Sequence, residues 1–205
     1  HIFGNVVDIE KLRNIIGPDI YILEDCAQST GATIRGRKAG SMGDISAFSF
    51  YPTKNLGAYG DGGMVLTNNP NFDDIARKGR MYGMLNKDEF IMDGINTRLD
   101  ELQAAILNVK LNYLDSMNLI RNKKVQLYKK LLNENYYTFQ LIQEDVFSVH
   151  HVLCVKVEGL SRDGLTHYLN DKRIDKEEAN KHDSIFINEI AATLEDKALG
   201  TGGSK

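Results

Sequence analysis

Two short apolar runs near the start of the chain constrain the fold most, because each is followed by polar residues that could carry chemistry. Residues 20–23 predict a buried strand that delivers Glu24 and Asp25 at its carboxyl end. Residues 45–50 predict a second strand, and the loop after it holds Lys54. Ligands bind beside the carboxyl ends of the strands in open α/β sheets. The sequence therefore predicts an α/β fold with a ligand site at this edge.

The remaining pattern completes a mostly parallel sheet with helices, followed by a smaller segment. Apolar spacing and turn residues predict helices over 8–16 and 72–80, a hairpin over 33–38, a strand over 64–67, a long helix from 98 to about 133 that bends near Asn118, a strand over 151–157 and a helix over 161–169. Thr97 and Asp100 predict the cap of the long helix. A change in composition near Asn133 divides the chain into a large domain, 1–133, and a small α+β segment, 134–205, with a polar tail.

Composition excludes several classes of function. A net charge of −3 gives no general attraction to nucleic acid or to anionic membranes. No apolar run approaches the roughly 20 residues of a membrane helix. Cys26 and Cys154 lack the spacing of metal ligands, so we expect reduced thiols in a cytoplasmic protein and no metal site. The chain begins at His1 without Met and ends in a glycine-rich stretch, so we expect a fragment of a longer protein.

Lys54 and Asp25 are the strongest candidates for chemistry. A lysine that forms a Schiff base and an acid that pairs with a pyridinium nitrogen are the protein groups that pyridoxal phosphate chemistry most needs. The ordinary alternatives are a solvated loop lysine and an aspartate that caps the turn after a strand. Side chains alternate along a strand, so Glu24 should point to the face opposite Asp25.

Other candidates could bind a phosphate or a flat ring, and each has an ordinary alternative. Ser49 could donate to a phosphate oxygen, or be a plain strand serine. Gln28 could lie against a ring, or be a solvated glutamine. Asn96 precedes the long helix, whose free N–H groups suit phosphate, although local capping explains it as well. The pair His150 and His151 at a strand start is interpreted as structural.

Six motifs occur in order along the chain: EDCAQ at 24–28, GRKAGSMGD at 36–44, FSFYPTKNLG at 48–57, GDGG at 60–63, RMYG at 80–83 and NTRLDELQAA at 96–105. In this order they resemble the DegT/DnrJ/EryC1/StrS sugar aminotransferases. The resemblance runs from residue 1 to about 114 and more weakly to about 169.

The resemblance implies the type I fold of pyridoxal phosphate-dependent transferases, usually a homodimer with active sites shared between subunits. Lys54 matches the lysine that forms the Schiff base and moves the proton, and Asp25 matches the pyridinium partner. Gln28 matches the residue beside the ring, and Ser49 matches a phosphate ligand. Asn96 matches an asparagine that reaches the phosphate in the neighbouring subunit's site.

The resemblance also implies the substrates: nucleotide-linked keto-sugars, with an amino acid, commonly glutamate, as the amino donor. One subgroup of the superfamily dehydrates sugars and has histidine at the position of Lys54, so the lysine argues against that subgroup. The family's segment before His1, which supplies further phosphate donors, is missing from this chain. The alternative function is therefore a truncated, non-catalytic remnant or interaction module of the same fold.

Overall fold

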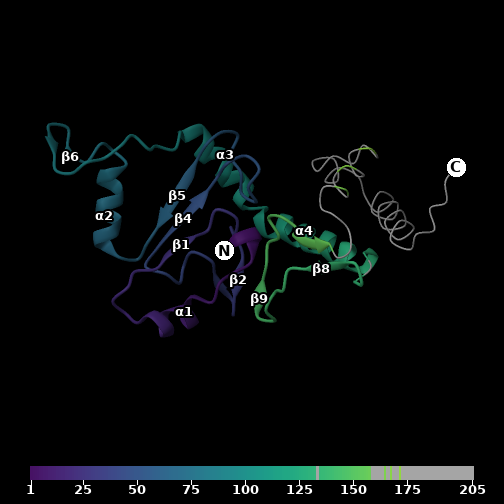
Figure 1. Ribbon diagram of the computed structural model, residues 1–205. Coiled ribbons are helices and arrows are strands. Elements are labelled where there is room, and N and C mark those ends of the chain that lie inside the picture. The colour runs from purple at the N-terminus through teal and green to yellow at the C-terminus, as the bar shows by residue number, and fades with distance from the viewer. Residues whose placement is uncertain (133, 158–163, 165–166, 168–170, 172–205) are drawn as a thin grey trace. The chain divides into compact units, whose positions relative to one another are not determined.

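The computed structural model describes residues 1–132, 134–157, 164, 167 and 171 (Figure 1). They fall into two compact units, His1–Asn122 with Ile142–Val152, and Lys123–Leu141 with Leu153–Lys205. Most of the helix predicted over 161–169, and the polar tail, lie outside the described residues. The predicted domain boundary near residue 133 stays a prediction.

A three-stranded sheet organises the first unit, with the order β1, β4, β5. Its strands are β1 (Leu23–Asp25), β4 (Ile45–Ser49) and β5 (Gly63–Leu66). β1 runs parallel to β4, with Asp25 opposite Ala47. β4 and β5 run antiparallel. The carboxyl ends of β1 and β4 therefore meet at one edge of the sheet.

Two expectations about this sheet need correction. The described strands form a mixed sheet rather than a mostly parallel one, because the chain after β4 folds back beside that strand. Main-chain bonds from Phe50 N to Gly62 O and from Ala58 N to Phe50 O, each 2.8 Å, hold this return. The first strand is Leu23–Asp25 rather than residues 20–23, because only the later residues pair with β4.

The predicted helix over 8–16 is confirmed as α1 (Ile9–Ile16), after a short 3-10 turn, η1 (Ile2–Gly4). Asp8 caps α1 by accepting a hydrogen bond from Lys11 N at 3.0 Å. Gly17 ends the helix with a φ of +83°, which suits glycine.

The hairpin predicted over 33–38 is confirmed as β2 (Thr33–Ile34) and β3 (Arg37–Lys38). A third strand, β9 (Val146–Phe147), pairs antiparallel with β2. This pairing returns the segment Ile142–Val152 to the first unit. It places residues from both ends of the described chain around one set of buried side chains: Val6, Cys26, Ala32, Ile34, Ala39 and Val149.

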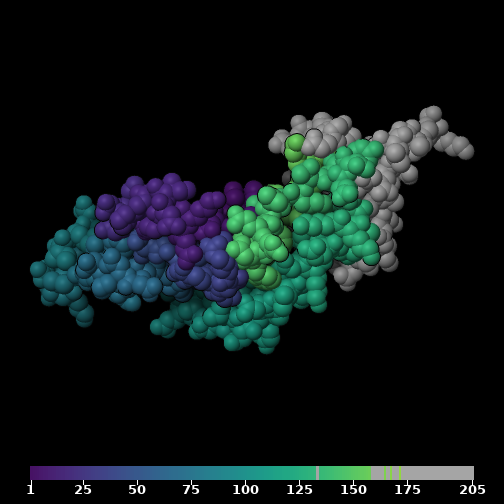
Figure 2. All heavy atoms as spheres, turned by 90° about the horizontal axis from the view of Figure 1, so that it is seen from below, coloured from purple at the N-terminus to yellow at the C-terminus, as the bar shows by residue number. Residues whose placement is uncertain are grey.

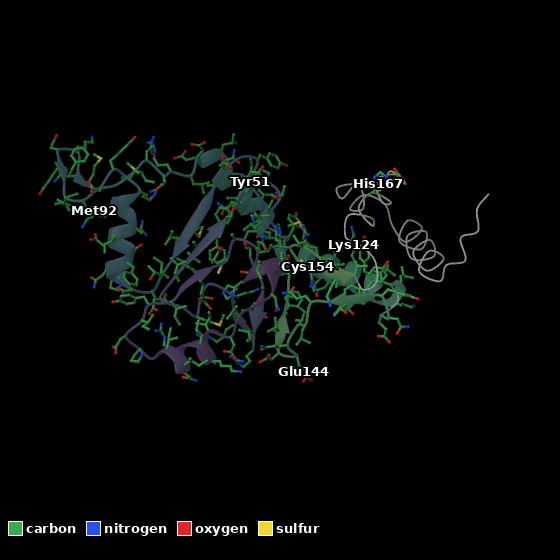
Figure 3. All side chains as sticks on the ribbon, viewed as in Figure 1. Tyr51, Met92, Lys124, Glu144, Cys154 and His167 are labelled. Atoms are coloured by element: carbon green, nitrogen blue, oxygen red, sulfur yellow. The ribbon has the colours of Figure 1, made fainter. Side chains whose placement is uncertain are left out.

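The predicted helix over 72–80 is confirmed as α2 (Pro70–Gly79). A small hairpin follows it, β6 (Met84–Asn86) with β7 (Glu89–Phe90). Figure 3 shows Met92, from the segment after this hairpin, beside α2. The return is close, because a Cβ added to Gly79 would lie 3.8 Å from Cε of Met92.

The long predicted helix is two helices, α3 (Glu101–Leu111) and α4 (Leu114–Leu131). The break falls at Asn112 rather than near Asn118. The Asn112 side chain donates to Asn108 O at 3.0 Å, which ends α3 locally. The predicted cap is also corrected, since Asp100 occupies the N-cap position but makes no side-chain capping bond.

α3 packs on the loop after β4 through a second apolar cluster: Phe50, Leu56, Ala58, Leu107 and Leu114. The space-filling view shows the N-terminal segment of the first unit, in purple, packed against its blue segments (Figure 2). Among the helices of the described residues, none is long and apolar enough to cross a membrane.

The second unit contains the last turns of α4 and a pair of strands, β8 (Tyr137–Phe139) and β10 (Val155–Val157). The two strands run antiparallel. The strand predicted over 151–157 is therefore shorter than expected. Lys129 Nζ lies 5.8 Å from the centre of the Phe139 ring, a cation–π contact between helix and strand.

Candidate functional site

The paired ends of β1 and β4 bring two of the predicted site residues to one edge. Asp25 ends β1 opposite Ala47, and Ser49 lies two residues further along β4. The loop of residues 51–57 follows Ser49 and carries Lys54. Figure 3 shows Tyr51, the first residue of this loop, at the end of the sheet near α3. Strand pairing thus explains why residues 24 positions apart share an edge.

Glu24 points into the protein, as the alternation of a strand predicts. Its side chain is buried, and its carboxylate accepts hydrogen bonds from the N–H groups of Gly40, Met42 and Gly43. It also contacts Nε2 of His1 at 2.8 Å. Glu24 therefore holds the turn before β4, which explains why the EDCAQ and GRKAGSMGD motifs occur together.

Asp25 points the other way and is exposed. Its Oδ1 accepts from Ala27 N at 3.0 Å, a local turn contact. Its second carboxylate oxygen accepts no hydrogen bond from the described residues, which leaves it available to a ligand.

His1, Glu24 and Cys26 bring possible metal-ligating atoms within 4.8 Å of one another. Their chemistry does not fit a metal. The carboxylate of Glu24 already accepts four hydrogen bonds, and Nδ1 of His1 accepts from Val7 N at 3.1 Å. Burial raises the pKa of Cys26 to about 12, so its thiol stays protonated. This cluster stabilises the fold.

Hydrogen bonds and close packing restrain the backbone of the Lys54 loop, residues 51–57. Lys54 N donates to Tyr51 O at 2.9 Å. Gly57 lacks a Cβ, and one added there would lie 2.3 Å from the Pro52 carbonyl oxygen. The amine of Lys110, from α3, donates to Gly57 O. These contacts fix the loop against α3.

The Lys54 side chain is partly buried, and its amine makes no hydrogen bond or ion pair with any described residue. A lysine in a rigid loop whose amine has no partner is free to react with a ligand.

The other predicted residues make local contacts. Gln28 Oε1 accepts from Phe3 N at 2.6 Å, and Ser49 Oγ accepts from Tyr51 N at 3.3 Å. Both side chains belong to partly buried residues beside the Asp25 edge.

The hydrogen bonds of Asn96 join it to residues outside the edge formed by β1 and β4. Its Oδ1 accepts from Arg98 Nε at 2.8 Å, and its backbone bridges to Met81. It is exposed and precedes the first residue of α3, Glu101, by five positions. The free N–H groups of that helix therefore begin several residues beyond it.

Sequence reasoning missed three residues around the Lys54 loop: Asn55, Asn118 and His151. Asn55 is buried, and Oδ1 of its amide lies 3.0 Å from Nδ1 of His151. The only signal in the sequence was the position of Asn55 next to Lys54. His151 was interpreted as structural, but it lies beside the loop rather than in a strand.

The pKa of His151 is lowered from its usual value. Burial of the ring is the largest cause, and the positive charges of Lys54 and Arg121 add to it. The ring contacts the side chain of Asn55, the residue that follows Lys54, so it lies beside the loop that carries the lysine. His151 is therefore a neutral neighbour of Lys54 at neutral pH.

Known proteins that resemble this chain belong to the family that the sequence motifs indicate. The model of the DegT/DnrJ/EryC1/StrS aminotransferase family matches residues 1–181. A curated relative, the dTDP-3-amino-3,4,6-trideoxy-alpha-D-glucose transaminase of Streptomyces venezuelae, is 38% identical over 177 residues. That match covers 85% of this chain and 46% of the relative. The chain spans about half the length of the curated relatives it matches.

Solved structures share the fold. A DegT DnrJ EryC1 StrS aminotransferase from Brucella abortus aligns with a TM-score of 0.78 and 30% identity, over 84% of this chain and 46% of that one. The S. venezuelae protein DesV, solved in complex with a ketimine intermediate, aligns with a TM-score of 0.77 and 33% identity, over 94% of this chain and 55% of that one. These likenesses confirm the predicted fold class.

Proposed function

Because the chain belongs to the DegT/DnrJ/EryC1/StrS aminotransferase family, we propose that it forms part of a pyridoxal phosphate-dependent sugar aminotransferase. The reaction moves an amino group from an amino acid to a nucleotide-linked keto-sugar. The observation that carries this proposal is the partly buried Lys54, whose amine has no partner among the described residues, in a rigid loop at the sheet edge of Asp25. The name of the curated relative, a transaminase of a dTDP-linked sugar, supports the substrate class.

The residues present fit the cofactor by their chemistry. Lys54 offers a primary amine, Asp25 a carboxylate with a free oxygen, Ser49 a hydroxyl and Gln28 an amide. When bound, pyridoxal phosphate supplies an electron-accepting ring to the reacting carbon. Lys54 would hold the group through Nζ and carry a proton at that nitrogen. Asp25 would keep a proton on the ring nitrogen.

We also propose roles for Ser49, Gln28 and Asn96 in binding the cofactor. Ser49 would donate to a phosphate oxygen, and Gln28 would lie against the ring. Asn96 stands at the start of the NTRLDELQAA motif, which lies within the family match, and this supports a role in the phosphate site of a neighbouring subunit, and hence a homodimer with shared sites. We propose glutamate as the amino donor and the cytoplasm as the location.

The proposal is tested by trapping the cofactor covalently on the complete 205-residue chain. Borohydride reduces the C=N bond between a lysine and pyridoxal phosphate, and mass spectrometry then locates the added pyridoxyl group. We expect the label on Lys54, none in Lys54→Met, and full labelling in the control Lys87→Met, whose lysine lies on the exposed β6–β7 turn. Glutamate should discharge the visible absorbance band of the unreduced protein.

Failure of a folded full chain to take up label at saturating cofactor would overturn the proposal and favour the non-catalytic alternative. Labelling at lysines other than 54 would reject the site while leaving cofactor binding intact. A panel of nucleotide-linked keto-sugars, tested with glutamate, then identifies the acceptor.

A further inference from the structure

Two buried asparagines connect the Lys54 loop to the loop that follows β1. Asn55 is 7% exposed and Asn118 only 1%. Asn55 Nδ2 donates to Asn118 Oδ1 at 2.8 Å. Asn118 Nδ2 in turn donates to Thr30 O at 3.2 Å. Thr30 lies two residues after Gln28, so a chain of two amides joins the two loops that carry the proposed site.

The orientation of both amides is fixed by groups that can only accept hydrogen bonds. The carbonyl of Thr30 requires an N–H from Asn118, which turns Oδ1 of Asn118 toward Asn55. Asn55 Nδ2 also donates to Val149 O at 3.0 Å, so both of its amide hydrogens are used. Its Oδ1 is left facing Nδ1 of His151, which must therefore carry the proton.

The residues around Asn118 leave space for its side chain and support it. Gly31 has a φ of +92°, and a Cβ added there would lie 2.6 Å from Nδ2 of Asn118. Asn122 supports Asn118 from the next turn of α4, donating to Asn118 O at 3.1 Å and to Ser148 O at 2.8 Å. Every polar atom of the two buried amides thus has a partner.

The two amides satisfy the main-chain carbonyls of Thr30 and Val149, which apolar side chains of similar size would leave without a donor. The hydrogen bonds of Asn55 and Asn118 also set the distance between the Lys54 loop and the loop that follows β1. Adjacent Cα atoms are about 3.8 Å apart along the chain, so a displacement of Asn55 moves Lys54 with it. Asn118 holds Asn55 against the segment that begins with Asp25.

We propose that Asn55 and Asn118 are positioning residues, which set the place of the Lys54 amine relative to Asp25, and that His151 fixes the Asn55 amide. The inference rests on the proposed function, because Lys54 and Asp25 are its reacting pair. It predicts that loss of either amide displaces the lysine even when the chain remains folded. A misplacement of about 1 Å costs on the order of 100-fold in rate.

The first test measures how fast Lys54 captures the cofactor in the full chain. Asn55→Ala and Asn118→Ala should slow reductive labelling of Lys54 and lower kcat by roughly 100-fold, with KM for the sugar within about twofold. The matched control is Asn112→Ala, which removes an exposed asparagine that also bonds to main-chain carbonyls. Labelling rates equal to wild type in the folded fraction of both variants would overturn the proposal.

The second test uses His151, at the edge of the network, in case the buried variants fold poorly. His151→Asn keeps an N–H near the position of Nδ1, and we expect labelling within about threefold of wild type. His151→Phe removes the donor, and we expect labelling slower by roughly tenfold, the effect of one lost hydrogen bond. Equal rates in the two variants would show that the donated hydrogen bond has no positioning role.

The third test needs no cofactor and separates this inference from the proposed function. Amide hydrogen exchange over residues 51–57 should become faster in Asn118→Ala, because the loop loses its link to Thr30, and should be unchanged in Asn112→Ala. If wild type never takes up label, the function fails while this exchange difference still supports the link between the loops. If exchange is unchanged in Asn118→Ala, the link itself is rejected.

Discussion

Glu24 and Asp25 are adjacent acids, yet their surroundings give them opposite roles. The carboxylate of Glu24 is buried and accepts three main-chain hydrogen bonds, whereas Asp25 is exposed and accepts one. Their surroundings differ because both residues lie on β1, and neighbouring side chains of a strand point to opposite faces of the sheet. Glu24 therefore belongs to the fold, whereas Asp25 is exposed at the edge where we propose the site.

Glu24→Gln should destabilise the protein. The amide keeps one oxygen as an acceptor, but its NH2 group faces the N–H donors from which the other carboxylate oxygen had accepted hydrogen bonds, and these buried donors lose their acceptor. We expect a loss of about 2 kcal/mol in the free energy of unfolding, measured by urea titration. Asp25→Asn is the matched control and should change stability by less than about 0.5 kcal/mol. Equal losses in both variants would contradict the separation of roles.

The pKa of His151 should respond to the charge on Lys54. In Lys54→Met the positive charge disappears while the packing is largely kept, so protonation of the imidazole becomes easier and its pKa rises toward the usual value. Burial and Arg121 remain and keep the pKa below 6.5. An NMR titration of the His151 ring measures the change, with Lys87→Met as control. An unchanged or lowered pKa would place the two groups out of electrostatic range.

The sequence motifs indicate the proposed reacting residues, Lys54 and Asp25, but give little sign of the residues proposed to support them. Lys54 and Asp25 stand in motifs whose members are close along the chain, so a local pattern could find them. Asn55 and Asn118 are 63 positions apart, and Asn55 and His151 are 96 apart. No periodicity joins residues at such separations, and the segment that carries His151 reaches Asn55 only once β9 returns to β2.

Among the elements, those with local signals were predicted closely. α1 has an N-cap aspartate and a terminal glycine, and the β2–β3 hairpin has a turn between short strands. The break between α3 and α4 was misplaced, because an asparagine inside a helical pattern suggested a bend at 118. The side chain of Asn118 instead bonds across to Thr30 and leaves α4 intact.

The turn at Gly31 offers a test at this scale. Gly31 and Gly36 both have positive φ, at +92° and +75°, but a Cβ would meet Asn118 only at Gly31 and nothing within 4 Å at Gly36. Gly36→Ala should therefore cost about 1 kcal/mol, from backbone strain alone. Gly31→Ala should cost about 3 kcal/mol, because Asn118 must also move. Urea unfolding measures both, and equal costs would mean that Asn118 yields without loss.

At the scale of the whole molecule, β1 and β5 are the two edge strands of the main sheet among the described residues. β5 pairs with β4 only, and all four of its residues are exposed, among them Met64, Val65 and Leu66. The chain also spans only 46% and 48% of two of the relatives it matches. An exposed apolar edge strand is a template for pairing with another chain.

The 205-residue chain by itself should therefore self-associate through β5 at micromolar concentrations, into dimers or larger species. Val65→Lys places a charge in the middle of this strand and should shift the population toward smaller species in sedimentation velocity. Ile15→Lys is the matched control, because Ile15 is 73% exposed on α1, outside the sheet, and the same charge there leaves the edge unchanged. If both substitutions reduce association equally, net charge rather than the strand edge governs it. If neither does, β5 takes no part in the association.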